Sequence, residues 1–294
     1  MTRTVFIIFS ALAAPTSAWL QPLAQRCARA GRVAQPLPHA DDHDACAPLL
    51  AEPLPPAFAA ANRVLVSAVK GAIDHAYKGR DVARFYVLET IARVPYFSYL
   101  SCLHLYESCG MRTSVKLMRM HYAESDNELH HLLIMEALGG SDKFADRFVA
   151  QHLAFTYYWY CVLMYLVHPR AAYHLSELIE QHAFQTYDAF LRENEDELRR
   201  QPVPEVARRY YEGDDLMNHY MLHGDDARAA RPAPPAAARP PPRARRKRRK
   251  LRTLYDVFLE VRDDEGAHWD MLAHLVSYDA LEAPEGCEVP LSMA

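Results

Sequence analysis

The sequence predicts an all-α protein in which long helices form a bundle. Apolar residues recur with helical periodicity through most of the 294 residues, whereas the alternation typical of half-buried strands is hard to find. Glycine is scarce, with 10 residues, and 50% of the residues are hydrophobic, which is enough for one sizeable core. Two Glu-x-x-His motifs lie inside the periodic runs and indicate that this bundle has polar ligands in its interior.

Turn signals divide the periodic part into seven expected helices. They span residues 57–77, 82–108, 113–138, 142–167, 169–198, 205–211 and 254–277. Gly79 and Gly110 end the first two, and Gly139-Gly140 end the third. Pro169 follows the fourth, because the residue before a proline disfavours the helical conformation. We therefore expect one helical domain over residues 51–223 and 251–280.

Residues 1–50 read as a targeting region outside the fold. Arg3 precedes an apolar run and then small residues, which is the layout of a cleavable signal peptide. The run is too short to span a bilayer, and an Arg- and Ala-rich stretch through residue 32 without acids follows it, as in transit peptides. Such two-part targeting is typical of algae with secondary plastids and predicts a plastid, thylakoid location; simple secretion is the alternative.

A second segment, residues 224–250, is predicted to be a disordered Pro- and Arg-rich insertion, and residues 281–294 a C-terminal tail. The net charge of −4 includes nine Lys or Arg residues within 239–252, so the rest of the chain is acidic. That balance argues against nucleic-acid binding, although the basic run 245–250 alone could be read as a nuclear address. Six cysteines without a Cys-x-x-Cys pair predict neither a zinc site nor a disulfide framework.

Four of the expected helices carry a metal-ligand pattern. A three-residue step turns about 300° around a helix, so the Glu and His of each Glu-x-x-His share a face. With one glutamate from each of two further helices, the set is that of ferritin-like di-iron carboxylate bundles. The predicted ligands of two iron ions are Glu89, Glu128, His131, Glu180, Glu265 and His268. Spacing alone leaves Glu124, Glu136 and Glu177 open as ligands, and surface salt bridges remain an alternative reading.

Longer stretches around these motifs carry a family resemblance. Residues 88–97 read Leu-Glu-Thr-Ile-Ala-Arg-Val-Pro-Tyr-Phe, residues 127–136 Asn-Glu-Leu-His-His-Leu-Leu-Ile-Met-Glu, and residues 262–265 Arg-Asp-Asp-Glu. They resemble the plastid terminal oxidases of the alternative oxidase family, over about residues 84–277. The resemblance implies a membrane-bound, non-haem di-iron quinol oxidase that reduces O₂ to water with electrons from two quinols.

The resemblance also implies roles for five further residues. Tyr187 lies seven residues after Glu180, on the ligand face, and is expected to relay an electron and a proton; Tyr173 lies on the same stripe. Asp264 is expected to orient His268 or to pair with an arginine. The remaining three, expected to bind the quinone, are Leu88, His104 and Tyr165.

Two departures from the family pattern are visible. The third ligand reads Glu180-Gln181-His182, where the mitochondrial branch has three glutamates, and this favours the plastid branch. Many plastid relatives have an acid just before the last histidine, where this chain has Gly266-Ala267. Glycine there should weaken the helix by about 1 kcal/mol relative to alanine.

Residues 153–167 carry no formal charge, and residues 155–160 are unusually aromatic, as at a head-group boundary. This stretch is short for a span, so we expect a helix lying in one leaflet, which the resemblance also implies. A buried bundle helix is the alternative. A homodimer is implied by the resemblance alone.

The leading prediction is a plastoquinol:oxygen oxidoreductase. Its alternatives are a mitochondrial-type ubiquinol oxidase, a non-catalytic iron-binding helical bundle, and a nucleic-acid binder that uses the basic run.

Overall fold

A computed structural model describes residues 53–111, 113–213 and 250–277. All regular structure in these ranges is α-helical, so the prediction of an all-α bundle is confirmed. The predicted targeting region 1–50, the tail 281–294 and, apart from Lys250, the insertion 224–250 lie outside the described residues.

Eight helices are described, close to the expected ranges. They are α3 (Pro56–Ala76), α4 (Asp81–Ala92), α5 (Val94–Ser108), α6 (Val115–Ala137), α7 (Phe144–Val167), α8 (Pro169–Leu198), α9 (Glu205–Glu212) and α11 (Leu254–Ser277). The ends of α5 and α6 follow from backbone chemistry, because Gly110 and Gly139 have φ angles of 78° and 87°. Residues with a Cβ atom rarely adopt that conformation, so glycine stops both helices.

The expected helix over residues 82–108 is wrong in one respect, since it is divided at Arg93 into α4 and α5. Pro95 is the second residue of α5. Proline cannot donate a backbone hydrogen bond, and its ring clashes with the carbonyl four residues earlier, which interrupts a helix. The break places Glu89 on one helix and Tyr96 on the next.

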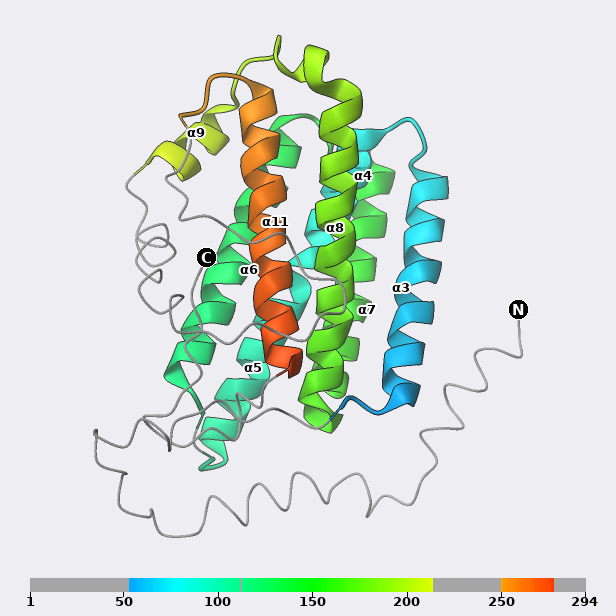
Figure 1. The fold of residues 1–294 in the computed structure, drawn as a ribbon, viewed down its shortest axis with the longest axis vertical. Helices are drawn as coiled ribbons and strands as arrows, with labels where there is room; N and C mark the ends of the chain where they lie inside the picture. The colour runs from blue at the N-terminus through cyan, green and yellow to red at the C-terminus, as the bar shows by residue number, and fades with distance from the viewer. Residues whose placement is uncertain (1–52, 112, 214–249, 278–294) are drawn as a thin grey trace.

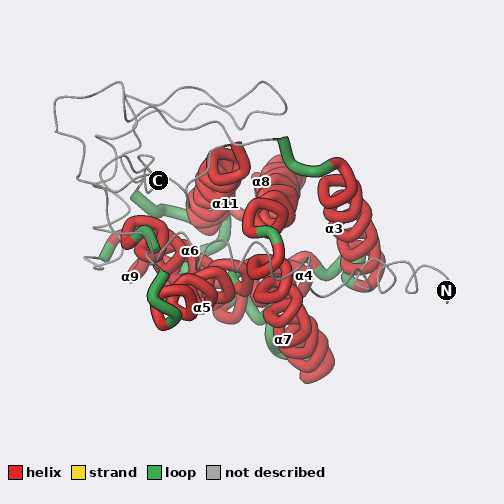
Figure 2. Tube along the Cα trace, turned by 90° about the horizontal axis from the view of Figure 1, so that it is seen from below, coloured by secondary structure: helices red, strands yellow, loops and turns green. Residues whose placement is uncertain are grey.

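The helices form two rows (Figures 1 and 2). In the view along the bundle, α11, α8 and α3 lie in one row, while α6, α5, α4 and α7 lie in the other. The most extensive packing joins α8 to α11, α3 packs on α8, and α4 packs against both α6 and α7. Helices α4, α6, α8 and α11, which carry the predicted ligands, therefore face one another across the interior.

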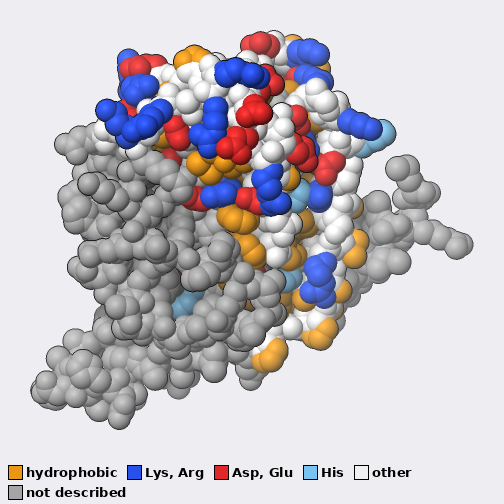
Figure 3. All heavy atoms as spheres, turned by 45° about the horizontal axis from the view of Figure 1, so that its top comes forward, with side chains coloured by type: hydrophobic (Ala, Val, Ile, Leu, Met, Phe, Trp, Pro, Cys, Tyr) orange, Lys and Arg blue, Asp and Glu red, His pale blue; other side chains and the backbone are white. Residues whose placement is uncertain are grey.

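Two apolar clusters fill that interior. One contains Phe85, Tyr187 and Phe258, and the other contains Tyr96 and Tyr173, among others. Along α4–α5 and along α8, the ligand glutamate lies between a residue of one cluster and a residue of the other. The polar centre therefore sits where the two clusters meet. Charged side chains of both signs gather on the end of the bundle that lies uppermost in Figure 1, as Figure 3 shows.

Candidate metal centre

The six predicted ligands converge in the interior. Their ligand atoms form two groups, each with all atoms within 4.8 Å of one another, and all six residues are buried. The first group, here called position A, contains Glu89 and His131, and the second, position B, contains Glu180 and His268. Glu128 and Glu265 belong to both groups. Two neighbouring ions that share two carboxylates fit this arrangement.

The histidine of each Glu-x-x-His motif contacts the glutamate of the other motif. His131 Nδ1 on α6 lies 3.0 Å from Glu265 Oε1 on α11. In return, His268 Nδ1 lies 2.8 Å from Glu128 Oε1. His131 Nδ1 is also 3.7 Å from Glu89 Oε2. The two motifs thus face one another rather than solvent, and the surface salt-bridge reading does not hold for them.

The hydrogen bonding of the four carboxylates tests whether the site suits metal. No hydrogen bond reaches Oε2 of Glu89, Oε2 of Glu180, or either oxygen of Glu128 and Glu265. Buried polar atoms in proteins almost always have such a partner. The two shared glutamates thus keep both oxygens available, and the two others keep one each. This donor set fits two divalent cations with oxygen and imidazole ligands.

The electrostatics agree with that fit. Burial raises the pKa of Glu128 and of Glu265 well above the ordinary value, and the neighbouring carboxylates raise both further. Burial likewise raises the pKa of Glu180 to about 7. Burial opposes charge on His131, but the contact with Asp264 and the neighbouring carboxylates of Glu89 and Glu128 raise its pKa well above the ordinary value. So many acids in one buried space need cations to remain ionised together.

Two tyrosines hold the unshared glutamates. Tyr187 donates a hydrogen bond to Oε1 of Glu89, and Tyr96 donates one to Oε1 of Glu180 with an O···O distance of 2.6 Å. Both tyrosines are fully buried. Tyr187 was predicted from its spacing, whereas Tyr96 was missed. The signal for Tyr96 was present, since it follows Glu89 by seven residues, just as Tyr187 follows Glu180.

Asp264 contacts a ligand, but not the one expected. The structure gives it a contact with His131 Nε2 at 3.4 Å, whereas the sequence suggested His268. Its carboxylate also accepts hydrogen bonds from Asn127 and from Tyr211 on α9. The sequence alternatively suggested pairing with an arginine, and the nearby Arg262 pairs with Asp263 and Asp188. Asp264 is therefore placed to fix the orientation of the position A histidine.

None of the three competing glutamates belongs to the groups of metal-ligand atoms found within the described residues. Glu124 is buried but lies 3.2 Å from His121 Nδ1, Glu136 is exposed, and Glu177 is half-buried.

Gly266 has a packing role that the sequence did not reveal. A Cβ atom built at this residue would lie 3.1 Å from the ring of Phe184 on α8. The missing side chain therefore permits the close packing of α8 against α11, which holds Glu180 beside Glu265.

An apolar cavity of about 310 Å³ reaches the centre from one side. Its walls come from α3, α4, α7 and α8, and they include Leu88, Glu89 and Tyr187. Polar groups on the wall are few; they include Lys70, His182 and Thr186, none of which was singled out as a binding residue. A cavity of this shape suits a ligand with a large apolar part and a small polar head.

The two other predicted quinone residues lie elsewhere. The side chain of His104 is 61% exposed, near Glu107, and Tyr165 is fully buried with its hydroxyl 2.8 Å from that of Tyr173. Neither lines the cavity, because His104 is on the exposed side of α5 and Tyr165 belongs to the aromatic cluster. Leu88 alone of the three lies on the cavity wall.

Comparison with known proteins identifies the family. The family model described as alternative oxidase matches residues 57–277. This chain belongs to the alternative oxidase family. It is 42% identical over 241 residues to "Ubiquinol oxidase 4, chloroplastic/chromoplastic" of Arabidopsis thaliana, which covers 78% of this chain and 64% of the relative. It is 27% identical over 127 residues to "Ubiquinol oxidase" of Trachipleistophora hominis, covering 43% of this chain and 40% of the relative.

Alternative oxidases are helical di-iron carboxylate proteins, and the centre described above has the ligands for two iron ions. The matched segment includes all six ligands and the cavity. The chain spans a little under two-thirds of the length of its chloroplastic relative.

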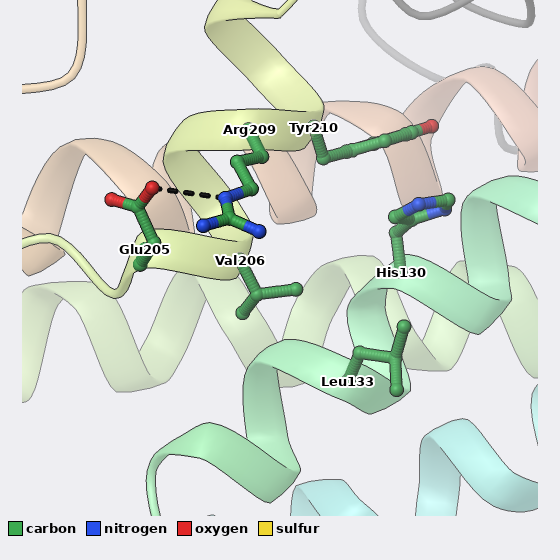
Figure 4. A pocket seen from close by; sticks show the side chains of 6 residues that line it. All are labelled: His130, Leu133, Glu205, Val206, Arg209 and Tyr210. Carbon is green, nitrogen blue, oxygen red and sulfur yellow. Dashed lines mark hydrogen bonds and ion pairs between the residues drawn. The ribbon is translucent and has the colours of Figure 1, made fainter.

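A second hollow of about 340 Å³ lies between α6 and α9 (Figure 4). Here Glu205 pairs with Arg209, and the ring of His130 stacks on Tyr210 at 3.9 Å. No metal ligand lines this hollow. Tyr210 accepts a hydrogen bond from Asn127, so these contacts anchor α9 beside the residues that hold Asp264.

Proposed function

We propose that this protein is a plastoquinol:oxygen oxidoreductase, which oxidises two quinols and reduces O₂ to water. One observation carries the proposal: an apolar cavity has Glu89, a ligand of position A, and Tyr187 in its wall. A quinol that enters this cavity comes within reach of the metal centre. When bound, the di-iron pair supplies the site at which O₂ is reduced.

The cavity offers distinct places for the parts of a quinol. Its apolar wall suits the ring and the isoprenoid tail. Burial lowers the pKa of His182 to about 4, so its imidazole is neutral near pH 7 and can accept a hydrogen bond from a quinol hydroxyl. Thr186 lies one turn further along α8, with its Oγ1 atom 3.3 Å from His182 Nε2. These two side chains are the polar pair that we assign to the quinol head group.

Tyr187 connects the cavity with the centre. It lines the cavity and donates a hydrogen bond from its hydroxyl to Glu89. Burial and the nearby carboxylates raise the pKa of Tyr187 well above its ordinary value, so the phenol keeps its proton at rest. It is therefore placed to pass an electron and a proton together. We assign the quinol site to Leu88, His182 and Thr186, which line the cavity, in place of His104 and Tyr165, which do not.

Membrane attachment in one leaflet is supported by the surface of α7. No helix in the described ranges is both long and apolar enough to cross a membrane. Yet α7 exposes large apolar side chains over most of its length, namely Phe144, Phe148, Val149, Leu153, Phe155, Trp159 and Leu163. Such a patch marks an interaction surface, and its aromatic content suits the head-group boundary. The cavity is lined partly by α7, so a quinol can enter from the lipid.

Flotation with liposomes tests this attachment. Replacing Phe155 and Trp159 by glutamate should abolish co-flotation of the protein, whereas Val115→Glu, an equally exposed site on α6, should not. Release of the unmodified protein by high salt alone would contradict embedding in the leaflet.

Location and assembly are inferred from other observations. The relative with 42% identity is named as chloroplastic, and the first 32 residues read as a signal followed by a transit segment. Together they support a plastid, and within it the thylakoid membrane of a secondary-plastid alga. A homodimer is part of the proposal through the family, and chemical cross-linking of the membrane-bound protein tests it.

Quinol oxidation is tested with the purified, iron-loaded protein. We expect O₂ uptake on decyl-plastoquinol that is inhibited by octyl gallate, and slower uptake on decyl-ubiquinol; the reverse preference would favour the mitochondrial-type alternative. Val66→Trp, which fills the cavity from α3, should raise KM. Val64→Trp is the matched control, because Val64 is exposed on the same helix and does not line the cavity. Bound iron without O₂ uptake would favour the non-catalytic bundle.

A further inference from the structure

Side chains that are not ligands contact the ligands of both metal positions in a similar way. At position A, Tyr187 holds Glu89 and Asp264 contacts His131. At position B, Tyr96 donates to Glu180 at 2.6 Å, and the edge of its ring meets His268 with centroids 5.5 Å apart. Tyr96 thus touches both of the ligands that belong to position B alone.

We propose that Tyr96 is the positioning residue of position B, holding Glu180 so that one carboxylate oxygen is left for the metal, and holding His268 by ring contact. This inference rests on the two-ion centre of the proposed function, but not on quinol oxidation.

The hydrogen bond has a direct consequence for Glu180. Oε1 of Glu180 is occupied by the phenol of Tyr96, whereas no hydrogen bond reaches Oε2. Glu89 has the same division, with Oε1 bonded to Tyr187 and Oε2 left over. The shared ligands Glu128 and Glu265 lack such a tyrosine bond and keep both oxygens. Each tyrosine therefore marks a glutamate that offers one oxygen to a single ion.

The arrangement is reciprocal between two segments of the chain. Tyr96 follows Glu89 by seven residues, yet it bonds Glu180; Tyr187 follows Glu180 by seven residues, yet it bonds Glu89. Each Glu–Tyr segment thus supplies a ligand to one position and a hydrogen-bond donor to the other. The loss of one phenol should accordingly weaken one metal position and leave the other.

The surroundings of Tyr96 suit a fixed donor. Its ring is fully buried and packs near the His121 ring, at a centroid distance of 6.3 Å. Burial and the nearby Glu180 and Glu124 raise the pKa of Tyr96 well above its ordinary value. Its hydroxyl therefore stays protonated and donates a hydrogen bond to Glu180. Tyr96 is the third residue of α5, directly after Pro95 and the helix break at Arg93.

Metal binding by the full chain, freed of metal and titrated with Fe(II) under anaerobic conditions, tests the proposal. The unmodified protein should bind two ions, and the Mössbauer spectrum should resolve two ferrous sites. In Tyr96→Phe, one site should lose affinity on the order of 10–100-fold, as is typical when a group that orients a ligand is removed, and only one spectral component should change. Tyr99→Phe is the matched control, since Tyr99 is equally buried on α5 and donates to Ala172 instead.

If Tyr96→Phe binds two Fe(II) ions with unchanged affinity and gives an unchanged Mössbauer spectrum, the inference is overturned. An unmodified protein that binds fewer than two ions would instead overturn the two-ion centre of the proposed function, so the two failures are distinguishable. If Tyr96→Phe does not fold, 3,5-difluorotyrosine at residue 96 keeps the shape and the hydroxyl but donates a stronger hydrogen bond. It should shift the signal of one site, and the absence of any shift would count against the proposal.

Discussion

At the residue scale, this chain separates the groups that hold metal from those that orient the holders. Glu128 and Glu265 keep all their oxygens, whereas Glu89 and Glu180 each give one to a tyrosine. Burial without compensation is costly for a carboxylate, so these four acids together make sense only around cations. Tyr187 and Tyr96, which orient these two glutamates, act through hydrogen bonds within the protein and are not themselves ligands.

Tyr187→Phe should reduce quinol-dependent O₂ uptake by roughly 100-fold or more, because a positioned proton-transfer group contributes at least that much. Two iron ions should still bind when iron is in excess, since all six ligands remain. Oxygen-electrode assays with iron quantified in the same sample measure both effects. Tyr99→Phe serves as a control with near-normal activity, and normal turnover in Tyr187→Phe would remove this tyrosine from the mechanism.

The metal-free protein should lose stability as pH rises through about 7. Burial raises the pKa of Glu177 and of Glu180 to about 7, so the folded state holds protons that the unfolded chain has already released. Such a contribution is fully present below the unfolded pKa and disappears above the folded one. Buried His121 and His182 have lowered pKa values and act in the opposite sense, but only below about pH 6.5.

Thermal unfolding of the metal-free protein should be measured from about pH 6.5 to about pH 8, above the range in which His121 and His182 act. The raised pKa of His131 acts in the same sense as those of the carboxylates. The Tm should fall across this window, whereas that of the iron-loaded protein should not, because bound metal requires ionised ligands. A metal-free Tm that rises across the window would contradict the raised pKa values.

At the element scale, the helix ends and the break at Arg93 decide how ligands from separate helices meet. Repetition of Glu-x-x-His predicted the shared faces of α6 and α11, since helix geometry alone places residues three apart together. The division of residues 82–108 was not predicted, although Pro95 was its signal. A proline is compatible with the first turn of a helix but interrupts a helix at an interior position, and the sequence alone did not show which position Pro95 occupies. The close contacts at Gly140 and Gly266 could not be predicted from the sequence, because they depend on which helix packs against the glycine.

Gly140→Ala should destabilise the fold by about 1–3 kcal/mol, the usual cost of overpacking. The added Cβ would lie 2.7 Å from the Cβ of Tyr86 and 2.8 Å from the carbonyl oxygen of Val82, so α4 would have to move. Denaturant unfolding followed by circular dichroism measures the loss. In contrast, Gly71→Ala on the open face of α3 should stabilise by about 0.5–1 kcal/mol, since nothing lies within 4 Å of its Cβ. Equal stabilities of the two variants would contradict this packing.

At the scale of the whole molecule, the two apolar clusters are large enough to keep the helices together, and the metal centre lies at their junction. Metal therefore adds stability to a bundle that has its own core. It also offsets the repulsion among the buried carboxylates, which otherwise weakens the junction.

Removal of both metal ions with a chelator should lower the Tm by roughly 10–20 °C. Each ion present at about 100 times its Kd stabilises the folded state by about 2.7 kcal/mol, and 1 kcal/mol corresponds to about 2–4 °C for a domain of this size. Far-ultraviolet circular dichroism at low temperature should remain helical, because both apolar clusters persist. Restoring iron, but not an equal concentration of Mg²⁺, should restore the Tm; unchanged stability after complete removal of metal would contradict a centre at the junction.

The sequence by itself predicted all the helices except for the break at Arg93, the six candidate ligands, the family resemblance and the place of Tyr187 on the ligand face. All of these follow from spacing within one helix or from long local motifs, which depend only on helix geometry and side-chain chemistry. The tertiary structure alone decided that Tyr96 holds Glu180, that Asp264 contacts His131, and that the cavity beside Leu88 excludes His104 and Tyr165. These relations join residues on different helices, and periodicity fixes which side chains share a face but not which faces meet.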